Sequence, residues 1–208
     1  MKALLLVDLQ NDFCSGGNLE VKKGDEVIPI ANSIIDKFRS EDFLILATKD
    51  WHPMTHKSFA SNSGGNIGEI GVLNGLPQVW WPDHCVQNTP GSEFHPNLKS
   101  QYIDKIIFKG TDENIDSYSG FFDNGKIKKT QLDCFLKDND IDTLYIMGLA
   151  TDFCVKFTAL DALELGYAVY LIKDGCRGVN LTPDSSEKAL EELKAKGAKI
   201  IESSSILK

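Results

Sequence analysis

The hydrophobic residues of this chain form short, nearly continuous apolar runs, separated by segments in which apolar residues recur every three or four positions. The continuous runs predict six strands, because a strand that is buried on both faces of a sheet is apolar at almost every position. These strands are expected at residues 3–7, 43–48, 105–109, 143–148, 168–172 and 199–201. Strands buried on both faces are typical of a parallel sheet.

Four segments with helical spacing alternate with these strands. They lie at residues 25–38, 128–139, 151–166 and 182–197. In the last of them, Thr182 followed by Pro183 predicts a cap and a first helical residue. Cys134 falls on the apolar face of the second, so we expect it in the core. The alternation predicts a doubly wound α/β fold, a three-layer sandwich around a mainly parallel six-stranded sheet.

One long segment follows neither pattern. Residues 51–104 contain all four histidines and all three tryptophans of the chain. An irregular stretch of this length inside a compact domain is usually functional. We therefore expect a single domain over residues 1–208, in which residues 51–104 form a long insertion that binds metal and substrate.

Composition and charge narrow the class of protein. With 208 residues, 42% of them hydrophobic and 25% charged, the chain fits one soluble globular domain. A net charge of −8 without a Lys/Arg-rich block argues against nucleic acid and against a membrane surface as partners. The early apolar run at residues 3–7 is too short for a signal peptide or a membrane span. Five cysteines without a CxxC pair favour reduced thiols and a cytoplasmic location.

The candidate chemistry lies where the predicted strands end. Ligands of open α/β sheets bind beyond the carboxyl ends of the strands, and Asp8, Asp50, Lys109 and Cys154 all fall at those ends. Each residue has a structural explanation by itself; Cys154, for example, is small enough to pack in the core. Their coincidence at one edge favours a functional interpretation. Cys154 also falls in the predicted first turn of a helix, where N–H groups and the helix dipole stabilise a thiolate.

A second group of residues has the chemistry of a metal site. Asp50 and His52 share a face of extended backbone, and His84 lies in the same irregular segment. Carboxylate and imidazole ligands suit Zn, Fe or Mn, and three protein ligands leave positions open for water or substrate. We therefore predict one divalent metal ion held by Asp50, His52 and His84. His56 is a candidate fourth ligand, and His95 is interpreted as structural.

Five sequence motifs together resemble the isochorismatase-like cysteine hydrolases, and within them the nicotinamidases (pyrazinamidases). They are LLLVDLQNDFCSGGNLEV, ATKDWHPMTHKSFAS, VWWPDHCVQNTPGSEFHP, FKGTDENIDSYSGFFDNG and GLATDFCVKFTALDALELGYAV. The resemblance covers almost the whole chain up to Val179. It implies a catalytic triad of Asp8, Lys109 and Cys154. It also implies the same metal ligands as above, and in some members the histidine at the position of His56 binds as well.

The resemblance further implies how a substrate is held. A cis peptide is expected between Leu149 and Ala150, and the backbone N–H groups of Ala150 and Cys154 are expected to form an oxyanion hole. Three aromatic residues match substrate-binding positions of the family: Phe13, Trp81 and Tyr118.

The implied activity is hydrolysis of nicotinamide to nicotinate and ammonia through a cysteine thioester, a reaction of NAD salvage, with pyrazinamide as a further substrate. Isochorismatases proper lack the nucleophilic cysteine, so Cys154 argues against that activity. Three alternatives stay open: another cysteine amidohydrolase of this superfamily, a metal-hydroxide amidohydrolase in which Cys154 is structural, and a binding module without activity. We expect a small-molecule substrate, no nucleic acid and no membrane partner, and we leave a homo-oligomer open.

Overall fold

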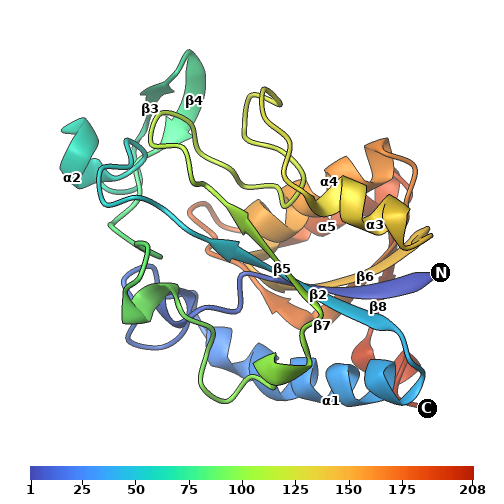
Figure 1. Ribbon diagram of the computed structural model, residues 1–208. Coiled ribbons are helices and arrows are strands. Elements are labelled where there is room, and N and C mark those ends of the chain that lie inside the picture. Colours follow the sequence, from blue (N-terminus) through green and yellow to red (C-terminus); the bar gives the residue numbers. More distant parts are fainter.

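The computed structural model describes all 208 residues and contains a six-stranded sheet with helices on both faces (Figure 1). The strands are β1 (Lys2–Val7), β2 (Leu44–Asp50), β5 (Lys105–Lys109), β6 (Thr143–Leu149), β7 (Ala168–Arg177) and β8 (Lys199–Ile201). Their order across the sheet is β5-β2-β1-β6-β7-β8, and every neighbouring pair is parallel. All six predicted strands are therefore confirmed, and β7 continues well beyond its predicted end at residue 172.

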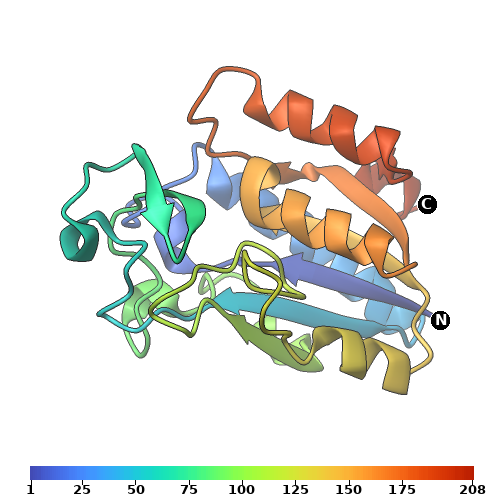
Figure 2. The same ribbon diagram turned by 90° about the horizontal axis from the view of Figure 1, so that it is seen from above.

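The helices form two layers of unequal size around this sheet. Helix α1 (Val27–Ser40) covers one face alone, and α3 (Leu132–Asp138), α4 (Lys156–Glu164) and α5 (Ser185–Ala195) cover the other (Figures 1 and 2). The apolar side of α1 is buried against the sheet, as its helical spacing predicts. The three-layer α/β sandwich is therefore confirmed. No helix in the structure has both the length and the apolar character needed to cross a membrane.

Two details of the predicted helices are wrong. Helix α5 begins at Ser185, because Asp184 adopts a left-handed conformation with φ +65° and Thr182 lies in the preceding turn, hydrogen-bonded to Ser185. Cys134 is exposed on the short helix α3, whose buried residues are Leu132 and Leu136. A residue two positions from both lies about 200° around the helix from each of them, and so it faces solvent.

Most of the irregular segment 51–104 gathers at the end of the molecule away from both termini, and its last residues run back to the start of β5 (Figures 1 and 2). It contains a short helix, α2 (Ala60–Ser63), and an antiparallel hairpin of β3 (Ile70–Leu73) and β4 (Leu76–Val79). The hairpin was not predicted, because its strands are only four residues long. A local signal existed, since the Asn-Gly pair at the turn has positive φ at both residues, as tight hairpin turns require.

The strand order places a crevice between β1 and β6. From β1 the chain adds β2 and β5 on one side, and from β6 it adds β7 and β8 on the other. Such a reversal is where open α/β sheets bind ligands. Gly148 allows the two strands to approach here: its φ is +134°, and a Cβ atom would lie 2.1 Å from the carbonyl oxygen of Val7. Asp8 follows β1 into this crevice, and Cys154 follows β6.

Candidate active site and metal centre

Cys154 lies in a π-helical turn, Thr151–Val155, that joins the end of β6 to α4. The peptide bond between Leu149 and Ala150 is cis, so this implied feature is confirmed. Cys154 is buried, and its sulfur points into the crevice toward groups from β1 and β5. Because this turn directly follows β6, the thiol lies at the carboxyl edge of the sheet.

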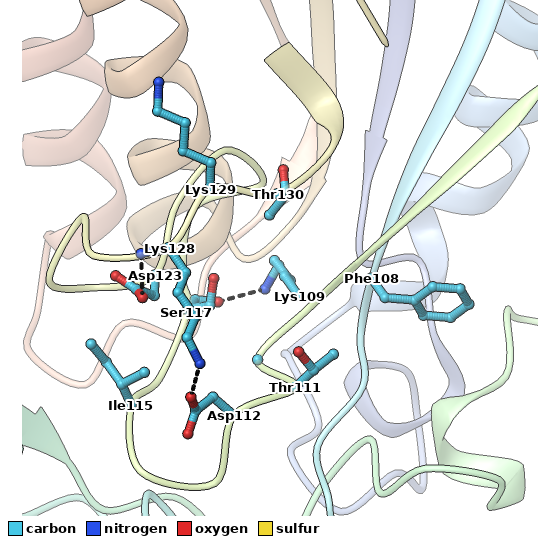
Figure 3. Close-up of a pocket in the computed structure, with 11 residues that line it drawn as sticks. Phe108, Lys109, Thr111, Asp112, Ile115, Ser117, Asp123, Lys128, Lys129 and Thr130 are labelled. Atoms are coloured by element: carbon cyan, nitrogen blue, oxygen red, sulfur yellow. Dashed lines mark hydrogen bonds and ion pairs between the residues drawn. The ribbon is translucent and has the colours of Figure 1, made fainter. Parts of the chain in front are cut away.

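Lys109 joins Cys154 to Asp8. Its Nζ atom lies 2.9 Å from Asp8 Oδ2 and 3.3 Å from Cys154 Sγ, and it donates to the carbonyl of Ser117 at 3.0 Å. Figure 3 shows this lysine reaching from the end of β5 to Ser117. Both residues line a cavity of about 130 Å³. On the other side of the carboxylate, Thr48 Oγ1 donates to Asp8 Oδ1 at 2.5 Å. The structure therefore brings the three predicted triad residues into direct contact.

The charges around Cys154 do not favour a resting thiolate. Burial raises the pKa of the Cys154 thiol; the Lys109 ammonium opposes this, and the Asp8 and Asp50 carboxylates add to it, so that the pKa lies well above its usual value. Burial also raises the pKa of Asp8, against the attraction of Lys109. These charges do not support the expectation of a thiolate stabilised by the helix N-terminus in the resting site. A thiol with a carboxylate beside it to accept its proton describes the site better.

Asp50, His52 and His84 converge on one point. Asp50 Oδ2 lies 3.7 Å from His52 Nε2 and 3.8 Å from His84 Nε2, and all three residues are buried. The other carboxylate oxygen of Asp50 is bonded to Lys109, so Asp50 belongs to both groups of residues. The structure therefore places the predicted metal ligands next to the triad.

The donor set fits a divalent cation. Nε2 of His52 is buried and has no hydrogen-bond partner in the protein, which is unusual for a structural histidine. Around the crevice, three carboxylates (Asp8, Asp50 and Asp116) and one ammonium (Lys109) leave a formal charge of −2 when the thiol and the imidazoles are neutral. Buried charge of this size requires compensation, and a divalent ion with carboxylate and imidazole ligands would supply it.

Aromatic side chains enclose the space in front of Cys154. Phe13, Trp81 and Tyr118 line the same cavity as Cys154, Asp50 and His84. Trp81 Nε1 donates to the hydroxyl of Tyr118 at 3.2 Å. Phe153 packs edge-on against both rings, at centroid distances of 4.9 Å and 5.3 Å. An apolar slot that ends at a thiol suits a small aromatic amide.

Sequence reasoning missed residues that support this site. Phe153 and Asp116 line the cavity. Gln10 is fully buried and binds the backbone of Asp50 on both sides: its Nε2 donates to the carbonyl at 2.8 Å, and its Oε1 accepts from the N–H at 2.8 Å. Phe153 and Gln10 lie in quoted motifs beside Cys154 and Asp8, but nothing local shows what they contact.

The two other histidines differ in how close they lie to these three residues. His56 is buried beside His52, with ring centroids 4.3 Å apart, but its Nδ1 is bonded to Ser58. His95 Nε2 lies 3.4 Å from Asp25 Oδ1, outside the crevice. The structure thus keeps His56, and not His95, within reach of the metal site.

Comparison with known proteins gives one consistent picture. A model of the isochorismatase domain matches residues 2–205. The chain is 54% identical over 197 residues to the nicotinamidase of Escherichia coli (strain K12). This alignment covers 95% of this chain and 92% of that relative. A nicotinamidase/pyrazinamidase of Acinetobacter baumanii is 41% identical, with a TM-score of 0.93 over 99% of this chain and 97% of the other. The pyrazinamidase of Pyrococcus horikoshii, solved in complex with zinc, is 42% identical, with a TM-score of 0.80 over 97% and 98% of the two chains.

Proposed function

Because the chain belongs to the isochorismatase domain family, we propose that its crevice hydrolyses nicotinamide to nicotinate and ammonia. One observation carries this proposal: a buried thiol–lysine–carboxylate group and an Asp-His-His group meet at a single aromatic cavity. The chain is 54% identical to a nicotinamidase over nearly its whole length. Pyrazinamide is a further substrate, as the names of related pyrazinamidases suggest.

The triad residues carry the covalent steps. Asp8 takes the proton of the Cys154 thiol, and the ammonium of Lys109 stabilises the negative charge that passes between them. The sulfur forms a bond to the carboxamide carbon while the carbonyl electron pair moves to oxygen. When this tetrahedral species collapses, the C–N bond breaks and Asp8 returns the proton to the departing ammonia. Water then attacks the thioester with Asp8 as base, releasing nicotinate and restoring the thiol.

Backbone and aromatic groups hold the substrate during these steps. The N–H groups of Ala150 and Cys154 form the oxyanion hole for the carboxamide oxygen. Phe13 and Trp81 hold the two faces of the ring, and Tyr118 forms a further wall of the cavity. A substrate stacked in this slot has its carboxamide directed at the sulfur.

Asp50, His52 and His84 would hold one divalent metal ion, with zinc, iron and manganese as the candidates. Such an ion would supply a Lewis-acidic centre for the ring nitrogen of the substrate, which would orient the ring. The protein contributes the direction of the ligands, because Gln10 fixes the backbone of Asp50. The relative solved with zinc makes zinc the first ion to test.

We also propose a cytoplasmic location, supported by five cysteines that are all free thiols.

The deciding experiment measures ammonia release from nicotinamide and benzamide by the zinc-loaded protein. Benzamide has the same shape and reacting group but lacks the ring nitrogen. We expect its kcat/KM to be lower by up to about 10⁴-fold, because a site built around one polar contact rejects the analogue without it. Near-equal values would contradict the nicotinamidase assignment.

Cys154→Ala tests the covalent route in the same assay. We expect turnover to fall to background, with the zinc content unchanged. Substantial residual activity would favour attack by metal-activated hydroxide and a structural role for Cys154.

A further inference from the structure

A second group of buried polar side chains lies beside the proposed metal ligands. The metal-binding atoms of His52, His56 and Asp116 lie within 4.8 Å of one another, and all three residues are buried. His52 belongs to this group and also to the Asp50–His52–His84 set. Neither His56 nor Asp116 takes part in the reaction steps described above, so their burial beside the site needs another explanation.

The hydrogen bonds of the imidazoles show which ring nitrogens can accept a metal ion. Nδ1 of His52 lies 2.8 Å from the carbonyl oxygen of Gly110, and Nδ1 of His84 lies 2.8 Å from that of Pro82. A carbonyl oxygen only accepts, so each Nδ1 carries the hydrogen and donates it. The lone pair of each ring is therefore on Nε2, which faces Asp50.

His56 has the opposite arrangement. Its Nδ1 accepts a hydrogen bond from the backbone N–H of Ser58 at 3.2 Å and lies 2.7 Å from the Ser58 hydroxyl. A backbone N–H only donates, so the lone pair is on Nδ1 and the hydrogen is on Nε2. That Nε2 is fully buried and has no partner within the protein. In this tautomer, His56 is a hydrogen-bond donor and not a metal ligand.

Asp116 provides an acceptor near His56: one of its carboxylate oxygens lies within 4.8 Å of a ring nitrogen of His56. Its Oδ1 accepts from the backbone N–H of Ser117 at 2.7 Å, and its Oδ2 accepts from Nε2 of Gln78 at 2.9 Å. A carboxylate has further lone pairs, so Asp116 can also accept from a small ligand. Gln78 is a buried residue of β4, and it therefore holds the carboxylate in place from the hairpin.

We propose that His56 and Asp116 form an outer pair that holds a water molecule beside the metal ion, with His56 donating to the water and Asp116 accepting from it. One water spans two polar atoms that are about 4.6 Å apart when each hydrogen bond is about 2.8 Å long. The separations within the cluster, at most 4.8 Å, fit such a bridge. The proposal rests on the divalent metal of the proposed function and assigns His56 to a different role from that of His52 and His84.

The outer pair has a measurable consequence for metal binding. Groups outside the ligand shell that fix the surroundings of a metal typically change its affinity by 10–100-fold. Asp116 also contributes one of the three buried carboxylates whose charge a divalent ion compensates. Loss of either member should therefore weaken metal binding without changing the number of imidazole ligands.

The unaltered protein provides the first test. The chain has only four histidines, so the imidazole ¹⁵N signals can be assigned with single variants. In the zinc-loaded protein, we expect His56 to carry its hydrogen on Nε2, and His52 and His84 to carry theirs on Nδ1. X-ray absorption at the zinc edge should give two imidazole ligands. A third imidazole on zinc, or a hydrogen on Nδ1 of His56, overturns the proposal.

The second test measures zinc affinity by competition with a chelator. His56→Gln and Asp116→Asn should each bind zinc about 10–100-fold more weakly, with two imidazoles still on the metal. Asp112→Asn is the matched control, because Asp112 lies on the same loop but pairs with Lys128 at the surface. Its affinity should equal that of the unaltered protein. Unchanged affinity in both His56→Gln and Asp116→Asn overturns the proposal.

Asp50→Ala separates this inference from the metal assignment itself. If Asp50→Ala binds zinc as tightly as the unaltered protein, the metal site is wrong, and the outer pair is wrong with it. If Asp50→Ala loses zinc while His56 proves to be a ligand, the metal site stands and only the outer pair fails. Loss of zinc in Asp50→Ala, with two imidazoles in the unaltered protein, supports both.

Discussion

Lys109 has its ammonium group between the carboxylates of Asp8 and Asp50, and its side chain has no contact with solvent. Burial favours the neutral amine, but the two carboxylates outweigh it and hold the pKa of Lys109 well above its usual value. The lysine is therefore charged at neutral pH and compensates two buried negative groups. At this residue, the proposed chemistry and the stability of the fold depend on the same charge.

We expect Lys109→Met to abolish turnover and to lower the free energy of unfolding by about 3–5 kcal/mol, because it leaves buried carboxylates without their partner. Urea unfolding and ammonia release measure the two effects. Lys129→Met is the control: Lys129 is exposed, and its loss should change stability by less than about 0.5 kcal/mol. If Lys109→Met were as stable as the unaltered protein, Lys109 would not be needed to compensate these carboxylates.

Gly148 shows how two strands determine the shape of the crevice. It lies near the end of β6, where the backbone has φ +134° and Val7 of β1 is in direct contact. Gly166, before β7, also has a positive φ of +93°, but a Cβ atom there would meet nothing within 4 Å. An alanine at Gly166 therefore tests the cost of the backbone conformation alone. An alanine at Gly148 tests that cost together with the cost of a clash between the two strands.

Gly166→Ala should lower the free energy of unfolding by about 1 kcal/mol, through the positive φ alone. Gly148→Ala adds a clash with the backbone of β1, so we expect a loss of about 3 kcal/mol or more, together with reduced turnover. Thermal and urea unfolding of the two variants provide the comparison. Equal losses would show that β1 and β6 can separate without cost.

Helix α3 is attached to the start of β7 by one charged hydrogen bond. The hydroxyl of Tyr167 donates to Asp133 Oδ1 at 2.8 Å, and Lys137 lies 2.8 Å from the other oxygen. Burial opposes the charged form of Asp133, but Lys137 and Tyr167 outweigh it and lower its pKa below 3.8. A carboxylate whose pKa is depressed by folding adds stability above its unfolded pKa and loses it as pH falls through the folded value.

Tyr167→Phe should therefore destabilise the protein by about 1 kcal/mol at pH 7, the usual net value of a hydrogen bond. The difference from the unaltered protein should shrink as the pH falls below about 4, where Asp133 takes up a proton. Urea unfolding of both proteins at several pH values measures this difference in the free energy of unfolding. A difference that does not change with pH would assign the effect to packing of the ring and not to the Asp133 charge.

The whole molecule is acidic, with a net charge of −8, and the groups around its buried crevice account for −2 of this formal charge. A divalent ion that binds only the folded protein stabilises it by RT ln(1 + [L]/Kd), about 2.7 kcal/mol at a hundredfold excess over Kd. Removal of the metal by a chelator should thus lower Tm, raise KM for nicotinamide and reduce turnover.

The zinc-dependent rise in Tm should disappear in His84→Ala and persist in His95→Ala, which removes a histidine outside the crevice. Calorimetry with and without zinc makes the comparison. Loss of the rise in both variants, or in neither, would place the stabilising metal elsewhere in the protein.

The strand runs and the residues after them were sufficient to predict the sheet and to place Asp8, Lys109 and Cys154 at one edge. Parallel strands that are buried on both faces have a distinct apolar pattern, and their carboxyl ends meet in space. The segment between residues 51 and 104 was predicted to be functional, but its hairpin was not predicted. Cys134 and the start of α5 were wrong, because short helices and turns depend on single backbone conformations.

By itself, the sequence determined which residue types reach the edge of the sheet and, through its motifs, the family. Only the tertiary structure decided what those residues do to one another. The high pKa of the Cys154 thiol and the tautomer of His56 depend on neighbours and burial that periodicity does not report, as does the contact of Gln78 with Asp116. The physical reason is one of range: an apolar pattern tells which side of an element is buried, whereas proton positions and charges are set by the few atoms that folding brings within hydrogen-bonding distance.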